Sequence, residues 1–226
     1  MDLPRLLDDL GPDLLAFAAS LVLLLAYYAV HRAHVQRDPA RSIQAVNELS
    51  RRLWVEHVMS RQSLDVMAVQ TLRNFIMVGI LMVSTATLLI IGTLTLSGQG
   101  EPLARTWQVL HGSGSAAQAL RLVKILFLLA DFLVVLFSFT MSIRIANQIL
   151  FMVNIPAELR APHPVLSVGA VAQRLNRAGR MVSIGMRSLF YAIPLVFWLF
   201  GPVFLLLAAA GLVLALASID RQSPSA

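Results

Sequence analysis

Four long apolar stretches run through the sequence, and each is long enough to cross a lipid bilayer. A membrane-spanning helix needs about 20 consecutive, mostly apolar residues. The four stretches cover residues 13–30, 75–96, 120–141 and 189–219. Apolar residues make up 58% of the chain and charged residues 13%, whereas soluble domains have about 45–50% and about 25%. These features predict an all-α integral membrane protein with four transmembrane helices, the last of them kinked by Pro194 and Gly201–Pro202.

The first stretch has the flanks of a retained membrane anchor. A cleaved signal peptide carries a basic segment before its apolar run and a small-residue cleavage site after it. Here Arg5 is outnumbered by four aspartates up to the start of the run, and Tyr27, Tyr28 and the basic pair His31–Arg32 follow it. We therefore expect this helix to be an uncleaved anchor.

Arginine is distributed unevenly between the connecting segments. Of the 18 lysine and arginine residues, seven fall between residues 31 and 74 and six between residues 142 and 188. Segments rich in Arg and Lys face the cytoplasm in multi-pass proteins. These two connections are therefore predicted to be cytoplasmic, with the N-terminus and the C-terminus both outside. This topology predicts a multi-pass protein of the inner (plasma) membrane, with anionic lipids bound at its cytoplasmic face.

The cytoplasmic connections are predicted to be helical extensions of the bundle within a single membrane domain. Helical patterns cover residues 39–60, 63–74, 142–153 and 167–188, and Asn154–Ile155–Pro156 is the expected stop of the third. Apolar side chains on one face of the first helix are Ile43, Val46, Leu49, Leu53 and Trp54. This face suits a membrane surface or a partner, or it packs on the protein's own cytoplasmic helices.

Composition and motifs disfavour several classes of function. The sequence has no cysteine, so disulfides, thiolate nucleophiles and cysteine-bound metals are excluded. His31 and His34 lie three residues apart, but a metal needs further ligands, so neither a metal nor another cofactor is expected. Phosphate-binding glycine loops and nucleophile motifs are missing, so we do not expect an enzyme. The net charge of +6 fits membrane orientation better than nucleic-acid binding.

Asp131 is the first candidate functional residue. It lies about ten residues into the third stretch, which places it about 15 Å deep, near the bilayer midplane. A carboxylate at this depth is costly and marks a functional site by default. Lys124 and Ser138 share its helix face, seven residues to either side. We expect Asp131 to face inward and to bond to hydroxyls, either as a proton or cation relay or as a packing contact between helices. Hydroxyls predicted at its depth are those of Ser20, Ser84, Thr85 and Thr87.

A second candidate is a polar ring at the inner membrane interface. Arg73, Arg144 and Arg187 lie where the second, third and fourth spans are predicted to meet the cytoplasm, with Asn74 and Asn147 beside them. Arginine binds phosphate through its planar fork, so the ring would form a vestibule for an anion, a substrate or a lipid phosphate. The alternative is that these arginines only orient the protein in the bilayer.

Several short stretches resemble the DUF599 family of bacterial and plant membrane proteins, whose function is undescribed. The matching stretches are Ala68–Asn74 with Ile76–Met77, Ser142–Arg144 with Asn147, Val153–Pro156, Leu175–Arg177, Arg187–Tyr191, Pro194, Trp198 and Gly201–Pro202. The resemblance extends over most of the chain from about Asn47 onward. It implies a membrane protein with four spans and assigns no catalytic residues.

Two functions remain open on these observations. The first is an oligomeric channel or transporter for a small ion or solute, with Asp131 and the arginine ring along its pathway. Because four spans rarely enclose a pathway alone, this function implies a homo-oligomer. The alternative is a non-catalytic structural or accessory subunit that docks to a larger membrane complex and needs only packing surfaces.

Overall fold

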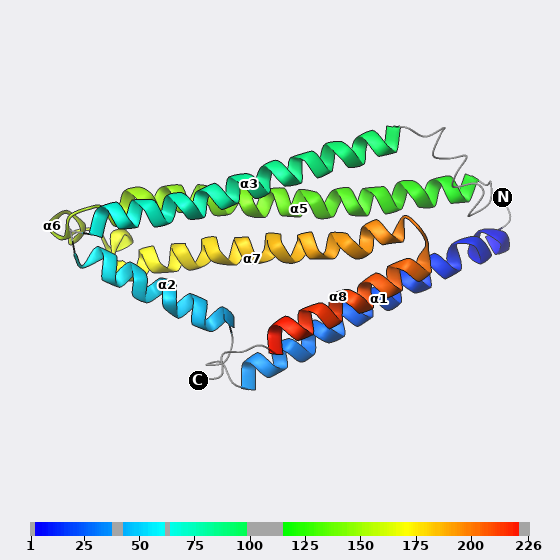
Figure 1. Cartoon of the computed structure of the whole chain (residues 1–226), viewed down its shortest axis with the longest axis horizontal. Helices are drawn as coiled ribbons and strands as arrows, with labels where there is room; N and C mark the ends of the chain where they lie inside the picture. The colour runs from blue at the N-terminus through cyan, green and yellow to red at the C-terminus, as the bar shows by residue number, and fades with distance from the viewer. Residues whose placement is uncertain (1–2, 38–42, 62–63, 99–114, 222–226) are drawn as a thin grey trace. The chain divides into compact units, whose positions relative to one another are not determined.

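A computed structural model describes residues 3–37, 43–61, 64–98 and 115–221 (Figure 1). All regular structure in this part of the chain is helical, in seven α-helices and one short 3-10 turn, with no strand. The α-helices are α1 (Leu3–Arg37), α2 (Ile43–Met59), α3 (Asp65–Gly98), α5 (Ser115–Val153), α6 (Ala157–Arg160), α7 (Val168–Trp198) and α8 (Pro202–Arg221), and the turn η3 spans Pro164–Leu166.

Four helices are long and apolar enough to cross a membrane, which confirms the number of predicted spans. Their apolar parts are Gly11–Val30, Asp65–Ser97, Leu120–Val153 and Val168–Trp198. The 39 residues of α5 extend over about 58 Å, nearly twice the thickness of a bilayer core. The segments predicted over 63–74 and 142–153 are therefore continuous with spans, and α5 ends at Val153 as predicted.

The stretch 189–219 differs from its prediction as one kinked span. The helix α7 passes through Pro194 without a break and ends at Trp198, and α8 begins at Pro202 and runs back in the opposite direction (Figure 1). Gly201 has a φ angle of 139°, which L-residues with a side chain rarely adopt. Pro202 follows at the first turn of α8, where a missing amide hydrogen costs nothing. These two residues therefore reverse the chain where a kink was expected.

The chain divides into two compact units. Unit 1 comprises Met1–Arg37, Thr87–Leu133 and Ser188–Gln222. In it, α1 and α8 lie side by side (Figure 1) and form a small core in which Ala16 and Leu205 pack with Trp198, the last residue of α7. A second cluster joins α5 to α7 through Leu128, Phe132 and Ala192. These contacts fix α1, α5, α7 and α8 against one another within unit 1.

Unit 2 comprises Asp38–Ala86 and Val134–Arg187, with Ser223–Ala226. Its core joins α2 to parts of α3, α5 and α7 through apolar side chains. Close helix approaches occur where glycine faces a large side chain: a Cβ on Gly79 would come within 2.7 Å of Ile143, and one on Gly185 within 2.7 Å of Phe139. Fully buried members of the core are Val55, Ala68, Ile149, Val171 and Ala178.

The apolar face predicted for the 39–60 segment turns away from the core of unit 2. The helix α2 covers residues 43–59 of that segment, and residues 38–42 lie outside the described part of the chain. Leu49 and Leu53 are 56% and 54% exposed, whereas Trp54 packs against the core. Val55, Val58 and Met59 form the buried side instead. Apart from Trp54, this face therefore does not pack on the core of unit 2.

Candidate functional site

Asp131 forms a hydrogen bond between two helices of unit 1. Ser188 of α7 donates its hydroxyl to Asp131 Oδ1 at 2.5 Å, and Asp131 Oδ2 is buried with no hydrogen-bond partner among the described residues. The expected hydroxyl contact is confirmed, but its donor differs from the four predicted. Ser20 and Thr85 donate instead to Phe17 and Leu81 of their own helices, which is the usual alternative for hydroxyls in helices.

A buried ion pair involves Lys124, which precedes Asp131 by seven residues in α5. Lys124 Nζ of α5 lies 2.7 Å from Asp13 Oδ1 of α1, and both side chains are less than 10% exposed. The indole Nε1 of Trp198 donates a hydrogen bond of 2.8 Å to the same carboxylate oxygen. Two donors from two other helices therefore hold this oxygen. The attraction between the two charges offsets the cost of burying them. Removal of either partner would leave the other charge buried without compensation.

Aromatic rings close around the ion pair. The ring of Phe17 stacks on Trp198 with centroids 4.7 Å apart, and Phe127 lies 5.1 Å from Phe17. Lys124 Nζ also lies 5.4 Å from the centroid of the Trp198 ring, in the range of a cation–π contact. These rings exclude water from the charges, so the ion pair acts in a low dielectric where charge–charge forces are strong.

The contact between Lys124 and Asp13 was not predicted from the sequence. The available signal was that Lys124 is the chain's single lysine and that Asp13 begins the first apolar run, both at the predicted outer end of their spans. Along α5, Lys124 and Asp131 are seven residues apart, about 10.5 Å on one helix face. Unit 1 therefore carries a buried carboxylate on α1, Asp13, which is paired with a cation, and a half-buried one on α5, Asp131, which is held by a hydroxyl.

The predicted arginine ring does not form at one level. In unit 2, Gly79 of α3 lies against Ile143 and Gly185 of α7 lies against Phe139. This register places Arg187 about 18 Å from Arg73 along the bundle, with Arg144 between them. The offset arises because the close contacts between α3, α5 and α7 lie at different distances along each helix from its arginine. The binding role of these residues stays a prediction. Arg187 is half-buried; the exposed candidates are Arg73, Asn74, Arg144 and Asn147.

A polar network of unit 2 ties α2 to α7. Arg51 Nε donates to Asn176 Oδ1 at 2.8 Å, and Asn176 Nδ2 donates to the carbonyl oxygen of Glu48 at 3.3 Å. Arg180 pairs with the Glu48 carboxylate at 3.4 Å. Burial lowers the pKa of Arg51 and Glu48 acts against that shift. Gly179 leaves room for the Arg51 guanidinium, since a Cβ there would lie 2.7 Å from its Cζ.

Among the described residues, no three His, Asp or Glu side chains gather in a way that could hold a metal ion. The side chains of His31 and His34 lie outside the described part of the chain.

Four long apolar helices indicate a membrane-embedded helical protein. The chain matches the model of one protein family, DUF599, described as a protein of unknown function, over residues 15–225. The chain therefore belongs to the DUF599 family, as the resemblance implied. No significant match was found to a curated protein or to a solved structure.

Proposed function

We propose that the protein is an oligomeric channel or transporter for a small ion, with Asp131 as the group that binds a proton or small cation on its way. The observation that carries this proposal is the Asp131 carboxyl, which is held by Ser188 on one oxygen and has no partner on its buried second oxygen. A purely structural carboxyl would use both oxygens, because a buried acceptor without a donor costs free energy. The free oxygen is the place where a proton or cation would bind.

The Asp13–Lys124 pair supports a pathway along α5. It lies about 10.5 Å from Asp131 on the same helix face, and its charges are shielded by Phe17 and Trp198. A cation that reached Asp131 from this end would meet the Lys124 ammonium first. The pair would therefore act as a barrier that opens only when the Asp13–Lys124 contact breaks.

We infer a revised topology for a protein of the inner (plasma) membrane. The N-terminus would lie outside and the two arginine-rich connections inside, facing anionic lipids. Ala16 of α1 and Leu205 of α8 pack in one cluster, and the two helices run on in the same direction. Arg221 would then reach about the level of Arg32 on the inner side. The shorter apolar helix α8 would then be a fifth crossing, and the C-terminus would be inside, in place of the outside position expected from four crossings.

Proton and cation flux into liposomes tests the proposal. Asp131→Asn keeps an acceptor for Ser188 and removes the charge, so we expect flux to fall about tenfold or more without loss of assembly. Glu56→Gln, an exposed carboxylate of α2, is the matched control and should leave flux unchanged. Wild-type flux in Asp131→Asn would refute the proposed function.

The exposed face of α2 favours the alternative function of an accessory subunit. Val46, Leu49 and Leu53 form an apolar stripe opposite the buried side of the helix, and such stripes mark docking surfaces. This function predicts that a partner protein co-purifies in fixed ratio in mild detergent, and that Leu49→Glu with Leu53→Glu releases it. A homo-oligomer without a second protein would count against the alternative and for the channel or transporter.

A further inference from the structure

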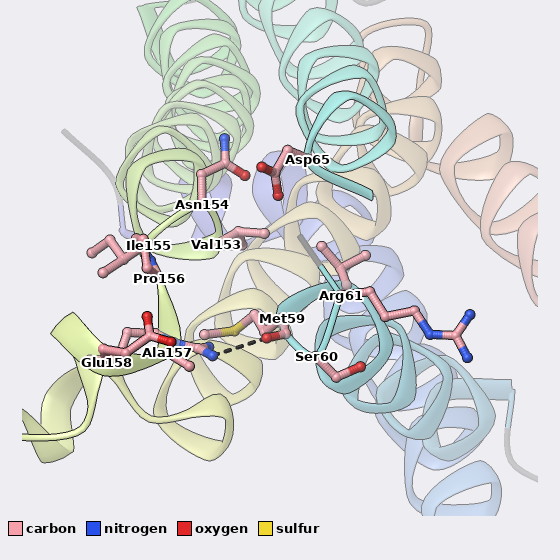
Figure 2. Close-up of a pocket in the computed structure, with 12 residues that line it drawn as sticks. Met59, Ser60, Arg61, Asp65, Val153, Asn154, Ile155, Pro156, Ala157 and Glu158 are labelled. Atoms are coloured by element: carbon pink, nitrogen blue, oxygen red, sulfur yellow. Dashed lines mark hydrogen bonds between the residues drawn. The ribbon is translucent and has the colours of Figure 1, made fainter. Parts of the chain in front are cut away.

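A groove in unit 2 opens where three chain segments meet (Figure 2). Its volume is about 350 Å³, and its walls come from the end of α2, the start of α3 and the link between α5 and α6. Four consecutive lining residues, Val153 to Pro156, are among the stretches that resemble DUF599. The proposed pathway through Asp131 belongs to unit 1 and makes no use of this groove.

Arg160 lines the groove, and only one of its three guanidinium nitrogens has a hydrogen-bond acceptor among the described residues. Its Nη2 donates a hydrogen bond of 2.9 Å to the carbonyl oxygen of Met59, whereas Nε and Nη1 are buried without any acceptor. A buried charged donor without an acceptor costs more free energy than a neutral one. No acceptor for these two nitrogens lies among the described residues, and solvent does not reach them in this conformation. A ligand in the groove would supply the missing acceptor once the Arg160 side chain turns toward it. A phosphate or carboxylate would supply two oxygens that match the guanidinium fork.

The charge of the remaining walls selects against a purely anionic ligand. The carboxylates of Asp65 and Glu158 line the groove and are exposed. Arg61 also contributes to the lining, but its guanidinium points away from the other lining side chains (Figure 2). An oxyanion at Arg160 would therefore have two carboxylates near it, and a positive charge carried by the same ligand would offset their repulsion.

We propose that this groove binds a zwitterion in which an oxyanion next to a primary ammonium contacts Arg160. The best fit is a phosphoethanolamine group, because its phosphate matches the two free nitrogens of Arg160 and its ammonium donates hydrogen bonds to Asp65 or Glu158. Choline lacks N–H donors, and a glycerol headgroup lacks the positive charge. The same group occurs on a membrane lipid and on the free molecule, and both sources share this chemistry.

Binding of the full-length protein in lipid nanodiscs tests the proposal. We would measure how well ethanolamine, choline and glycerol phospholipids displace a fluorescent ethanolamine phospholipid, with free phosphoethanolamine as a fourth competitor. We expect the ethanolamine lipid to bind about tenfold better than the other two lipids. Competition by free phosphoethanolamine at similar concentration identifies a soluble ligand, and its failure identifies the lipid; either result agrees with the site.

Three variants assign the binding to this groove. Arg160→Lys keeps a donor for the Met59 carbonyl but loses the fork, so affinity for the ethanolamine lipid should fall about tenfold while the protein stays folded. Asp65→Asn with Glu158→Gln should abolish the preference for ethanolamine over choline. Arg177→Gln, an exposed arginine of α7, is the matched control and should bind as the wild type does.

Two results would overturn the proposal. One is equal or tighter binding of the glycerol phospholipid, which would mean that net negative charge alone is recognised. The other is unchanged affinity in Arg160→Lys with a thermal midpoint equal to that of Arg177→Gln. Neither result bears on ion flux through Asp131, so the proposed function and this site fail independently.

Discussion

The indole of Trp198 donates a hydrogen bond to Asp13, although the two residues are 185 positions apart in the sequence. Lys124 reaches the same carboxylate oxygen from a third helix. The start of α1, the first part of α5 and the end of α7 are thereby joined in one buried cluster. Because charged groups are scarce in this protein and costly in lipid, this single cluster fixes how three helices of unit 1 meet.

Replacing one partner of the Asp13–Lys124 pair should destabilise the protein much more than replacing both partners. Lys124→Met leaves Asp13 charged and buried, so we expect a loss of about 3–5 kcal/mol in the free energy of unfolding. Asp13→Leu combined with Lys124→Met replaces both charges by apolar groups and should recover most of that loss. The free energies of unfolding of the wild type, Lys124→Met and the double variant can be measured in a denaturing detergent. Equal losses in the single and double variants would show that the unpaired Asp13 charge is not what destabilises Lys124→Met.

Glycine at the helix contacts of unit 2 should be intolerant of side chains. A Cβ on Gly185 would lie 2.7 Å from the buried ring of Phe139, so Gly185→Ala is expected to destabilise the protein by about 1–3 kcal/mol. Gly92→Ala is the matched control, because nothing lies within 4 Å of its Cβ and alanine favours helix. The control should be neutral or slightly stabilising in thermal unfolding. A stable Gly185→Ala with a destabilised Gly92→Ala would contradict this packing.

The Ser188–Asp131 bond should be visible in a double-mutant cycle. Ser188→Ala removes the donor and leaves both oxygens of Asp131 unpaired, which is expected to cost about 1–3 kcal/mol of unfolding free energy. In the background of Asp131→Leu the same change should cost little, since no acceptor remains to be satisfied. Unfolding of the four proteins gives the coupling between the two residues. Additive effects would indicate that Ser188 stabilises α7 without acting on Asp131.

Local features of the sequence predicted the helices, and contacts between distant residues decided the rest. The stop at Asn154–Pro156 depends on neighbouring residues alone. The donor to Asp131 depended on helix register, which no local pattern encodes. Gly201–Pro202 is compatible with a kink and with a reversal, and only the packing of α8 on α1 distinguishes them.

The reversal at Gly201 leads to the last prediction, which concerns the side of the membrane that α8 reaches. The natural chain has no cysteine, so single cysteines can be introduced without background labelling. Ser218→Cys at the end of α8 should react from the same side as Ser50→Cys in α2, and Ser97→Cys at the end of α3 should react from the opposite side. A membrane-impermeant maleimide applied to intact cells and to inverted vesicles separates the two sides. If Ser218→Cys were labelled from the same side as Ser97→Cys, residues 189–219 would form a single fourth span and the C-terminus would lie outside. Gly201→Ala should cost about 1–3 kcal/mol of unfolding free energy, because its φ of 139° is strained for alanine.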